Sequence, residues 1–314
     1  MVTAGLAKAI ITQQGFYCKD GEAIKTAKSD GRKANRAEQQ TIIDAIYPSL
    51  TRAQGRMLML EATQCRGSSI WLTCLPIAEL GFALNRQEFR DALSLRYGWP
   101  MHGIPSTCAC GEAFDPDHAM SCATGGYSIV RHNHVRDYLA AQMSRVCAAV
   151  AVEPHLLPTM PDSPDQRRLD IKARGFWTGM HDAFFDVRVF YPCAPSYLNK
   201  TLPASFLHHE HTKKAAYQQH VLDVERGSFT PFVLSAVGGA GNEAIATLKR
   251  LVALLTMKSG DHPSKLMGRI RCELGFCLLR DALMMLRGNR KKISASFRLD
   301  SPLDVVLAES QLEF

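Results

Sequence analysis

Apolar side chains recur every three or four residues between 131 and 148, and this spacing predicts an amphipathic helix. Its apolar face carries Val135, Leu139, Met143 and Val146. The same spacing predicts a shorter helix from about residue 85 to residue 97, with an apolar face formed by Phe89, Leu93 and Tyr97. Three further helices are predicted at 212–225, 242–257 and 263–287.

Short apolar runs interrupt these helical patterns and predict the strands of a sheet. They cover residues 148–156, 169–174, 183–190 and 229–237. Residues 175–181 are suited to a hairpin connection between the second and third strands. The order from residue 131 is therefore helix, strand, strand, strand, helix, strand, helix, helix. It predicts an α/β or α+β core in which helices flank a mixed central sheet.

Composition divides the chain into four predicted parts. Residues 1–105 are expected to form a helical N-terminal spacer, and residues 106–126 a loop-like segment rich in Cys, Gly and Asp. Residues 127–290 carry the α/β pattern, and residues 291–314 are a polar tail. With 314 residues, the chain is long enough for one large domain or two smaller ones.

Lysine and arginine outnumber aspartate and glutamate, which gives a net charge of +7 and a pI of about 8.9. A basic surface suits a polyanion, because lysines and arginines that neutralise phosphates release counterions. A mildly basic protein without such a partner explains the same excess. The sequence has no secretory signal and no apolar stretch long enough for a membrane span, so we expect a nuclear or cytoplasmic protein and no membrane partner.

Most of the ten cysteines stand singly in apolar stretches, as buried free thiols do in a reducing compartment. Three of them form the pattern C-x-C-x7-H-x3-C with a histidine, and these residues are Cys108, Cys110, His118 and Cys122. Three thiolates and one imidazole are a common ligand set for structural Zn²⁺. The C-x-C step is shorter than usual, and the alternative is two loop thiols beside an unrelated histidine. We expect a zinc site.

Two lone acidic residues, Asp170 and Asp186, stand inside predicted strands that are otherwise apolar. A carboxylate in such a strand costs free energy unless a cation pairs with it. For either acid alone a salt bridge would be enough, for instance between Asp186 and Arg188 or Arg174. Two acids on adjacent strands instead favour Mg²⁺, which can activate a bound water and neutralise charge on a scissile phosphate.

Other side chains are candidates to complete such a site. Asp137 on the preceding helix is the candidate third carboxylate, and Glu153 competes with it. Lys213, Lys214 and Tyr217 lie within about one helical turn of one another, so either lysine is a candidate to reach the phosphate. Helical lysines are usually only solvated, which is the alternative for both.

Together these motifs resemble the restriction-like endonuclease region of site-specific non-LTR retrotransposon proteins. There a CCHC zinc knuckle precedes a PD-(D/E)XK-type nuclease, downstream of a reverse transcriptase. The matching features are Cys108, Cys110, His118 and Cys122, then Gly125-Gly126, Arg131-His132-Asn133, Leu169-Asp170-Ile171 and Asp186-x-Arg188. The resemblance covers about residues 70–240. The helix around Arg136-Asp137 is also similar to the acidic first helix of Holliday-junction resolvases.

The resemblance implies a Mg²⁺-dependent endonuclease that nicks DNA and carries a structural Zn²⁺. The implied catalytic residues are Asp170, Asp186, Arg188, Lys213, Lys214 and Asp137, and the first two of these would hold Mg²⁺. The implied nucleic-acid-binding residues are Arg131, His132, Asn133 and Tyr217. DNA is the expected partner and RNA a second candidate. The reverse transcriptase region is absent from this chain, so we expect a C-terminal piece of a longer protein or a host copy of it.

Two positions depart from the family pattern. Leu169 replaces a proline that carries no ligand. Arg188 stands where many such enzymes have lysine, and arginine stays charged, so it cannot transfer a proton at neutral pH. Lys213 or Lys214 would then have to reach in from its helix. The alternatives are an inactive nucleic-acid-binding module with the same fold, or a structural protein with no nucleic-acid role.

Overall fold

The computed structural model describes residues 69–158, 167–197 and 199–288, and residues 30–50 apart from 32, 33, 35, 36, 39 and 43. Contacts divide the chain into two units, residues 1–50 and 51–314. In the first unit the described residues are helical as far as the 3-10 helix η1, Tyr47–Ser49. The predicted tail, 291–314, and the first 29 residues of the predicted spacer lie outside the described residues.

A mixed sheet forms the centre of the second unit, with its four strands in the order β1-β2-β3-β4. The strands are β1 (Ala149–Val152), β2 (Ile171–Arg174), β3 (Asp182–Phe190) and β4 (Ser228–Ser235). The first three pair antiparallel, and β4 pairs parallel with β3. The predicted hairpin between β2 and β3 is confirmed, since Ile171 pairs with Phe185 and Arg174 with Asp182.

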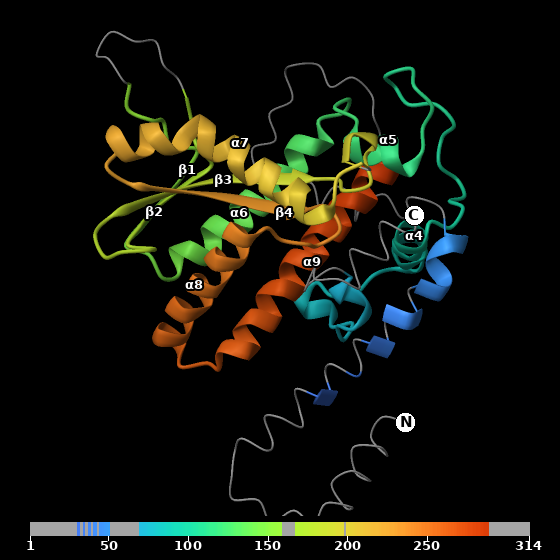
Figure 1. Ribbon diagram of the computed structural model, residues 1–314, viewed down its shortest axis with the longest axis horizontal. Helices are drawn as coiled ribbons and strands as arrows, with labels where there is room; N and C mark the ends of the chain where they lie inside the picture. Colours follow the sequence, from blue (N-terminus) through green and yellow to red (C-terminus); the bar gives the residue numbers. More distant parts are fainter. Residues whose placement is uncertain are drawn as a thin grey trace, which may run out of the picture. The chain divides into compact units, whose positions relative to one another are not determined.

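Helices cover both faces of the sheet, as Figure 1 shows, with α7 on one face and three helices on the other. Their bounds are α6 (Tyr127–Ser144), α7 (Leu202–Asp223), α8 (Asn242–Ser259) and α9 (Pro263–Arg287). The predicted element order and the mixed α/β architecture are therefore confirmed. α7 joins the parallel strands β3 and β4, which cannot be connected by a tight turn.

The start of α7 was the largest error of the sequence prediction, because the helix begins at residue 202 instead of 212. Thr201 caps the helix by accepting a hydrogen bond from the backbone N–H of Ala204, and Pro203 occupies the first turn. A threonine cap followed by a proline is a regular start signal for a helix. The extra turns carry Phe206, His209 and Glu210, which are all buried.

Side chains alternate along β3 as predicted. Phe185 and Val187 enter the main core between the sheet and helices α6, α8 and α9. Phe184 enters a smaller cluster beneath α7, and Asp186 meets a lysine of α7 on that same face. Each face of the strand therefore has its own environment, and the acid lies on the face that α7 covers.

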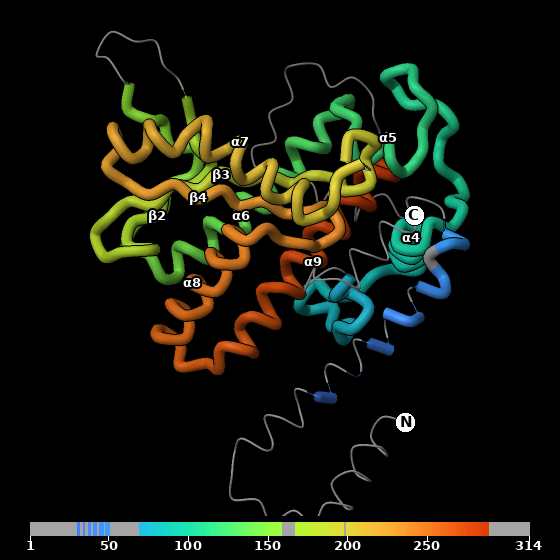
Figure 2. The backbone as a smooth tube through the Cα atoms, viewed as in Figure 1, coloured from blue at the N-terminus to red at the C-terminus, as the bar shows by residue number. Residues whose placement is uncertain are grey.

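The cysteine-rich segment packs within the second unit. Its short helix α5 (Pro116–Ser121) buries Ala119 and Met120 in a cluster that contains the C-terminal half of α9 (Figure 2). Helix α4 (Arg86–Tyr97) joins this cluster through Ala92. Arg287 at the end of α9 donates two hydrogen bonds, of 2.8 and 2.7 Å, to the carboxylate of Asp91 on α4. The cysteine-rich segment thus packs against two helices, α4 and α9.

The apolar face predicted for α4 does not face the core. Phe89 and Tyr97 are 46% and 41% exposed, whereas the buried residues of α4 are Asp91, Ala92 and Ser94. Two of these are small and permit close packing, and the third is neutralised by its ion pair with Arg287.

Candidate metal sites and a basic groove

The chain between residues 106 and 122 folds so that the four predicted zinc ligands converge. The N–H of Cys108 donates to the carbonyl of Glu112, and Gly111 adopts a φ of +98° in the turn that this bond closes. Asp115 then caps α5 by accepting a hydrogen bond of 2.7 Å from the N–H of His118. The tight turn brings the first two thiols toward α5, which carries His118 and ends at its C-cap residue Cys122.

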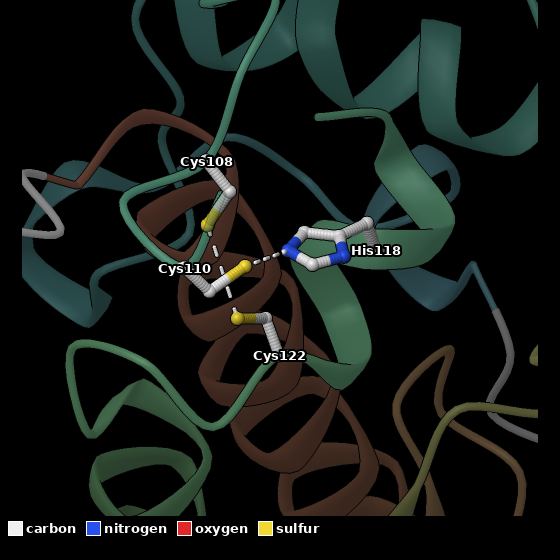
Figure 3. Close-up of side chains that lie close together, drawn as sticks. All are labelled: Cys108, Cys110, His118 and Cys122. Carbon is white, nitrogen blue, oxygen red and sulfur yellow. Dashed lines mark hydrogen bonds between the residues drawn. The ribbon is translucent and has the colours of Figure 1, made fainter. Parts of the chain in front are cut away.

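The ligand atoms of Cys108, Cys110, His118 and Cys122 all lie within 4.8 Å of one another (Figure 3). The sulfur atoms of Cys108 and Cys122 are 3.8 Å apart, and the sulfur of Cys110 is 3.3 Å from Nε2 of His118. Zn–S bonds of about 2.3 Å in a tetrahedron separate two sulfurs by about 3.8 Å. The group can therefore hold a metal ion such as zinc. Within the part of the chain that the structure describes, it is the one such group of three or more His, Cys, Asp or Glu side chains.

The second predicted site lies where β2 and β3 run side by side. Asp170, the residue before β2, donates its backbone N–H to the carbonyl of Phe185 over 3.1 Å, and Phe185 immediately precedes Asp186 on β3. Oδ2 of Asp170 also accepts a hydrogen bond of 2.6 Å from the N–H of Val187. The two acids that the sequence singled out are therefore neighbours.

Two basic side chains from different helices flank this acid pair. Nε2 of His132 on α6 lies 2.9 Å from Oδ1 of Asp170. Nζ of Lys213 on α7 lies 2.9 Å from Oδ2 of Asp186, whose side chain is only 8% exposed. The sequence left open whether Asp186 would pair with Arg188 or Arg174, and its partner is Lys213.

The two acids differ in their affinity for a proton. Burial, reinforced by the neighbouring Asp170, raises the pKa of Asp186 to about 6 against the opposing charge of Lys213. Burial also acts on Asp170, but the hydrogen bonds from His132 and the Val187 N–H outweigh it and lower its pKa. Adjacent carboxylates with perturbed pKa values cluster at functional sites.

The position of Lys213 depends on how α7 is attached to α8. The carboxylate of Glu210, one turn earlier on α7, is buried and accepts a hydrogen bond of 3.1 Å from the N–H of Glu243 in the first turn of α8. Gly241 leaves the space that this carboxylate occupies, since a Cβ there would collide with Oε1 of Glu210. Lys214 forms an ion pair with Glu243. These contacts fix the rotation of α7 about its axis.

A groove with a volume of about 500 Å³ is lined by His132 and Lys213, the partners of the two acids. Its wall also includes Met120 and Ser121 of the knuckle helix. Arg131 and Arg188 line it as well. Of the four basic side chains, Arg131 is buried, His132 and Lys213 pair with the two acids, and Arg188 is exposed. The excess of basic over acidic side chains in this lining suits an anion.

Two polar contacts hold the cysteine-rich segment in place beside this groove. Tyr191, just after β3, donates a hydrogen bond of 2.8 Å to Asp117 of α5. The guanidinium of Arg131 donates to the carbonyl of Met120 over 3.4 Å. Arg131 is 4% exposed, and burial lowers its pKa to about 10. Its contacts are therefore mainly structural, although its sequence context predicted a role in nucleic-acid binding.

Three other predicted residues lie in different surroundings. Arg188 is exposed on β3 and lines the groove. Tyr217 packs against Phe229, with its ring centroid 5.8 Å from Nζ of Lys213. Asn133 is half-buried on α6, next to the groove residue His132.

Among the contacts of the described residues, none joins Asp137 to Asp170 or Asp186. Its carboxylate accepts a 2.7 Å ion-paired hydrogen bond from Arg136, and Arg136 also pairs with Glu153. Both candidates for a third carboxylate are thus engaged with the same arginine. A local i, i+1 ion pair accounts for Asp137 without a metal.

Sequence reasoning did not identify two buried polar residues of α7, Glu210 and His209. Glu210 was hidden because α7 was predicted to start after it. His209 lies among aromatic rings, 4.7 Å from Phe190 and 5.4 Å from Tyr197 between ring centroids. Burial and the nearby cations, Arg188 first among them, lower the pKa of His209 to about 4. A longer predicted α7 would have included both residues.

No protein-family model matches this chain, and no curated protein matches it either. Among the helices of the described residues, none has the length and apolar character needed to cross a membrane. The roles of the Cys3His group and of the acid pair are therefore inferred from their own residues and geometry.

Proposed function

We propose that this protein is a Mg²⁺-dependent DNA endonuclease of the PD-(D/E)XK type that nicks DNA, related to the nuclease region of non-LTR retrotransposon proteins. The observation that carries the proposal is the proximity of Asp170, directly before β2, to Asp186 on β3, with Lys213 reaching Asp186 from α7. Metal-assisted phosphodiester hydrolysis uses carboxylates that hold the metal ion and cations that neutralise the phosphate.

Each residue has a separate part in the proposed reaction. Asp170 and Asp186 would hold the Mg²⁺, which when bound lowers the pKa of a water and offsets charge on the phosphate. Lys213 and Arg188 line the same groove and would neutralise the phosphate as it takes up negative charge. Because arginine keeps its proton at neutral pH, Lys213 is the residue that takes the place of the family lysine.

The Cys3His group is proposed to bind a structural Zn²⁺. Its four side chains are all supplied by one segment that would otherwise have a small apolar core, and metal binding can supply the folding energy that is missing. Because this segment lines part of the groove, a stable knuckle would also support the DNA backbone.

A second candidate function is nucleic-acid binding without cleavage. The observation that favours it is that Lys213 and His132 already pair with the two acids, so the site is charge-compensated without a metal. Supercoiled plasmid incubated with and without Mg²⁺ separates the two functions. Metal-dependent conversion to the nicked circle supports the endonuclease, whereas salt-sensitive binding with no nicking in Mg²⁺ or Mn²⁺ supports the binding module.

A further inference from the structure

His132 has a contact that its sequence context did not suggest. It lies in the Arg131-His132-Asn133 motif, for which nucleic-acid binding was predicted, yet its Nε2 atom is 2.9 Å from Oδ1 of Asp170. The other carboxylate oxygen of Asp170 accepts the N–H of Val187 over 2.6 Å. Each oxygen of Asp170 is therefore engaged by one donor, and the carboxylate plane is fixed from two sides.

Helix α6 holds this histidine firmly. Arg131, the residue before it, is buried and donates to the carbonyl of Met120 on the knuckle helix. His134, two residues later, is 2.6 Å from the buried carboxylate of Asp281 on α9. The first turns of α6 are thus attached to two other helices, and His132 lies between the attachment points.

We propose that His132 is a positioning residue for Asp170, and that it orients this carboxylate for metal binding instead of contacting the DNA phosphate. The inference rests on the proposed function, because it assigns a role within the same metal site. A carboxylate oxygen has two lone pairs, so Oδ1 can accept the hydrogen bond from His132 and still bind a cation. Hydrogen bonds that orient metal ligands typically change metal affinity by about 10- to 100-fold.

The alternative role for His132, a direct phosphate contact, predicts different behaviour. Loss of a phosphate contact weakens DNA binding whether or not a divalent metal is present. Loss of a group that orients Asp170 weakens metal binding and leaves metal-free DNA binding intact. Metal affinity and metal-free DNA affinity therefore separate the two roles without any measurement of cleavage.

The test measures Mn²⁺ binding to the full, zinc-loaded chain. The electron paramagnetic resonance signal of free Mn²⁺ reports how much of the ion stays unbound. His132→Ala is compared with His132→Gln, whose amide N–H can donate the same hydrogen bond, and with Asp170→Ala. His181→Gln is the matched control, because His181 lies in the exposed turn before β3. DNA affinity is measured for all proteins without added Mn²⁺ or Mg²⁺.

We expect His132→Ala to weaken Mn²⁺ binding by about 10-fold or more, His132→Gln to recover most of the loss, and His181→Gln to match the wild type. Metal-free DNA affinity should be the same for the wild type, His132→Ala, His132→Gln and His181→Gln, whereas Asp170→Ala removes a negative charge and should bind DNA at least as tightly. If His132→Ala keeps its Mn²⁺ affinity while Asp170→Ala loses it, the positioning role is wrong and the metal site stands. If Asp170→Ala binds Mn²⁺ as the wild type does, or the wild type binds none, the proposed function itself fails.

Discussion

Nζ of Lys213 lies 2.9 Å from Oδ2 of Asp186, whereas the adjacent Lys214 pairs with Glu243 of α8. Consecutive residues on a helix point about 100° apart, so only one of the two lysines can face the acid pair. The sequence offered both as candidates, and the attachment of α7 to α8 through Glu210 decides between them.

This choice predicts that the two lysines differ in function. Lys213→Ala should reduce nicking by about 100-fold, because it removes the cation closest to the acid pair. Lys214→Ala should change nicking only a few-fold, since its partner Glu243 lies on α8. Initial rates of plasmid nicking under identical Mg²⁺ concentrations measure both. Equal losses in the two variants would show that neither lysine acts at the scissile phosphate.

The Cys3His group predicts one zinc per chain. Cys108→Ser and Cys122→Ser should each lose that zinc and lower the melting temperature, because the knuckle packs on α9 through Ala119 and Met120. Cys147→Ser is the matched control, as its thiol lies outside the group. Metal analysis and thermal unfolding provide the readouts. Retention of zinc in both ligand variants would contradict the site.

Two glycines should respond in opposite ways to the same substitution. Gly241→Ala would place a methyl group against the carboxylate of Glu210, and we expect it to lower the free energy of unfolding by about 1–3 kcal/mol. Gly268, inside α9, has nothing within 4 Å of the added Cβ, so Gly268→Ala should raise the free energy of unfolding by up to about 1 kcal/mol. Urea unfolding measures both. Stabilisation by Gly241→Ala would mean that Glu210 does not contact the start of α8.

His209 should make the fold sensitive to mild acid. Its pKa is lowered to about 4 in the folded protein, so between that pH and its ordinary pKa of 6.5 the unfolded chain binds the extra proton. The contribution of His209 to stability therefore rises with pH across this window, by about 2 kcal/mol between pH 5 and pH 7, whereas Asp186, whose pKa is raised, contributes in the opposite direction.

His209→Phe should remove this contribution and make the pH dependence of stability less steep, because phenylalanine fits among the rings of Phe190 and Tyr197 without a titrating group. The exposed His181→Phe is the control and should keep the wild-type slope. The measurement is the free energy of unfolding in urea at pH 5 and pH 7. An unchanged slope in His209→Phe would show that the imidazole carries its proton in the folded state.

The sequence predicted well wherever the signal was local. Periods of two and of three to four residues gave the correct element order. A hairpin that pairs Ile171 with Phe185 is enough to bring Asp170 close to Asp186, because each acid is the next residue along the chain from one of this pair. The zinc ligands likewise lie within one short segment.

The errors arose where the deciding partner is distant in the chain. Asp91 of α4 is buried because Arg287, 196 residues later, neutralises it, and nothing near Asp91 indicates this partner. The contact of His132 with Asp170 likewise joins residues that are 38 positions apart, so the sequence alone does not show it.

The central claim is that Asp170 and Asp186 hold the metal for DNA nicking. The most direct test is Mg²⁺-dependent nicking of supercoiled plasmid by the wild type, Asp170→Asn and Asp186→Asn, with DNA affinity measured for each. The account predicts that the wild type nicks, that both variants lose nicking by at least about 100-fold, and that both still bind DNA. Nicking at the wild-type rate by either variant, or binding without nicking by the wild type in Mg²⁺ and Mn²⁺, would contradict it.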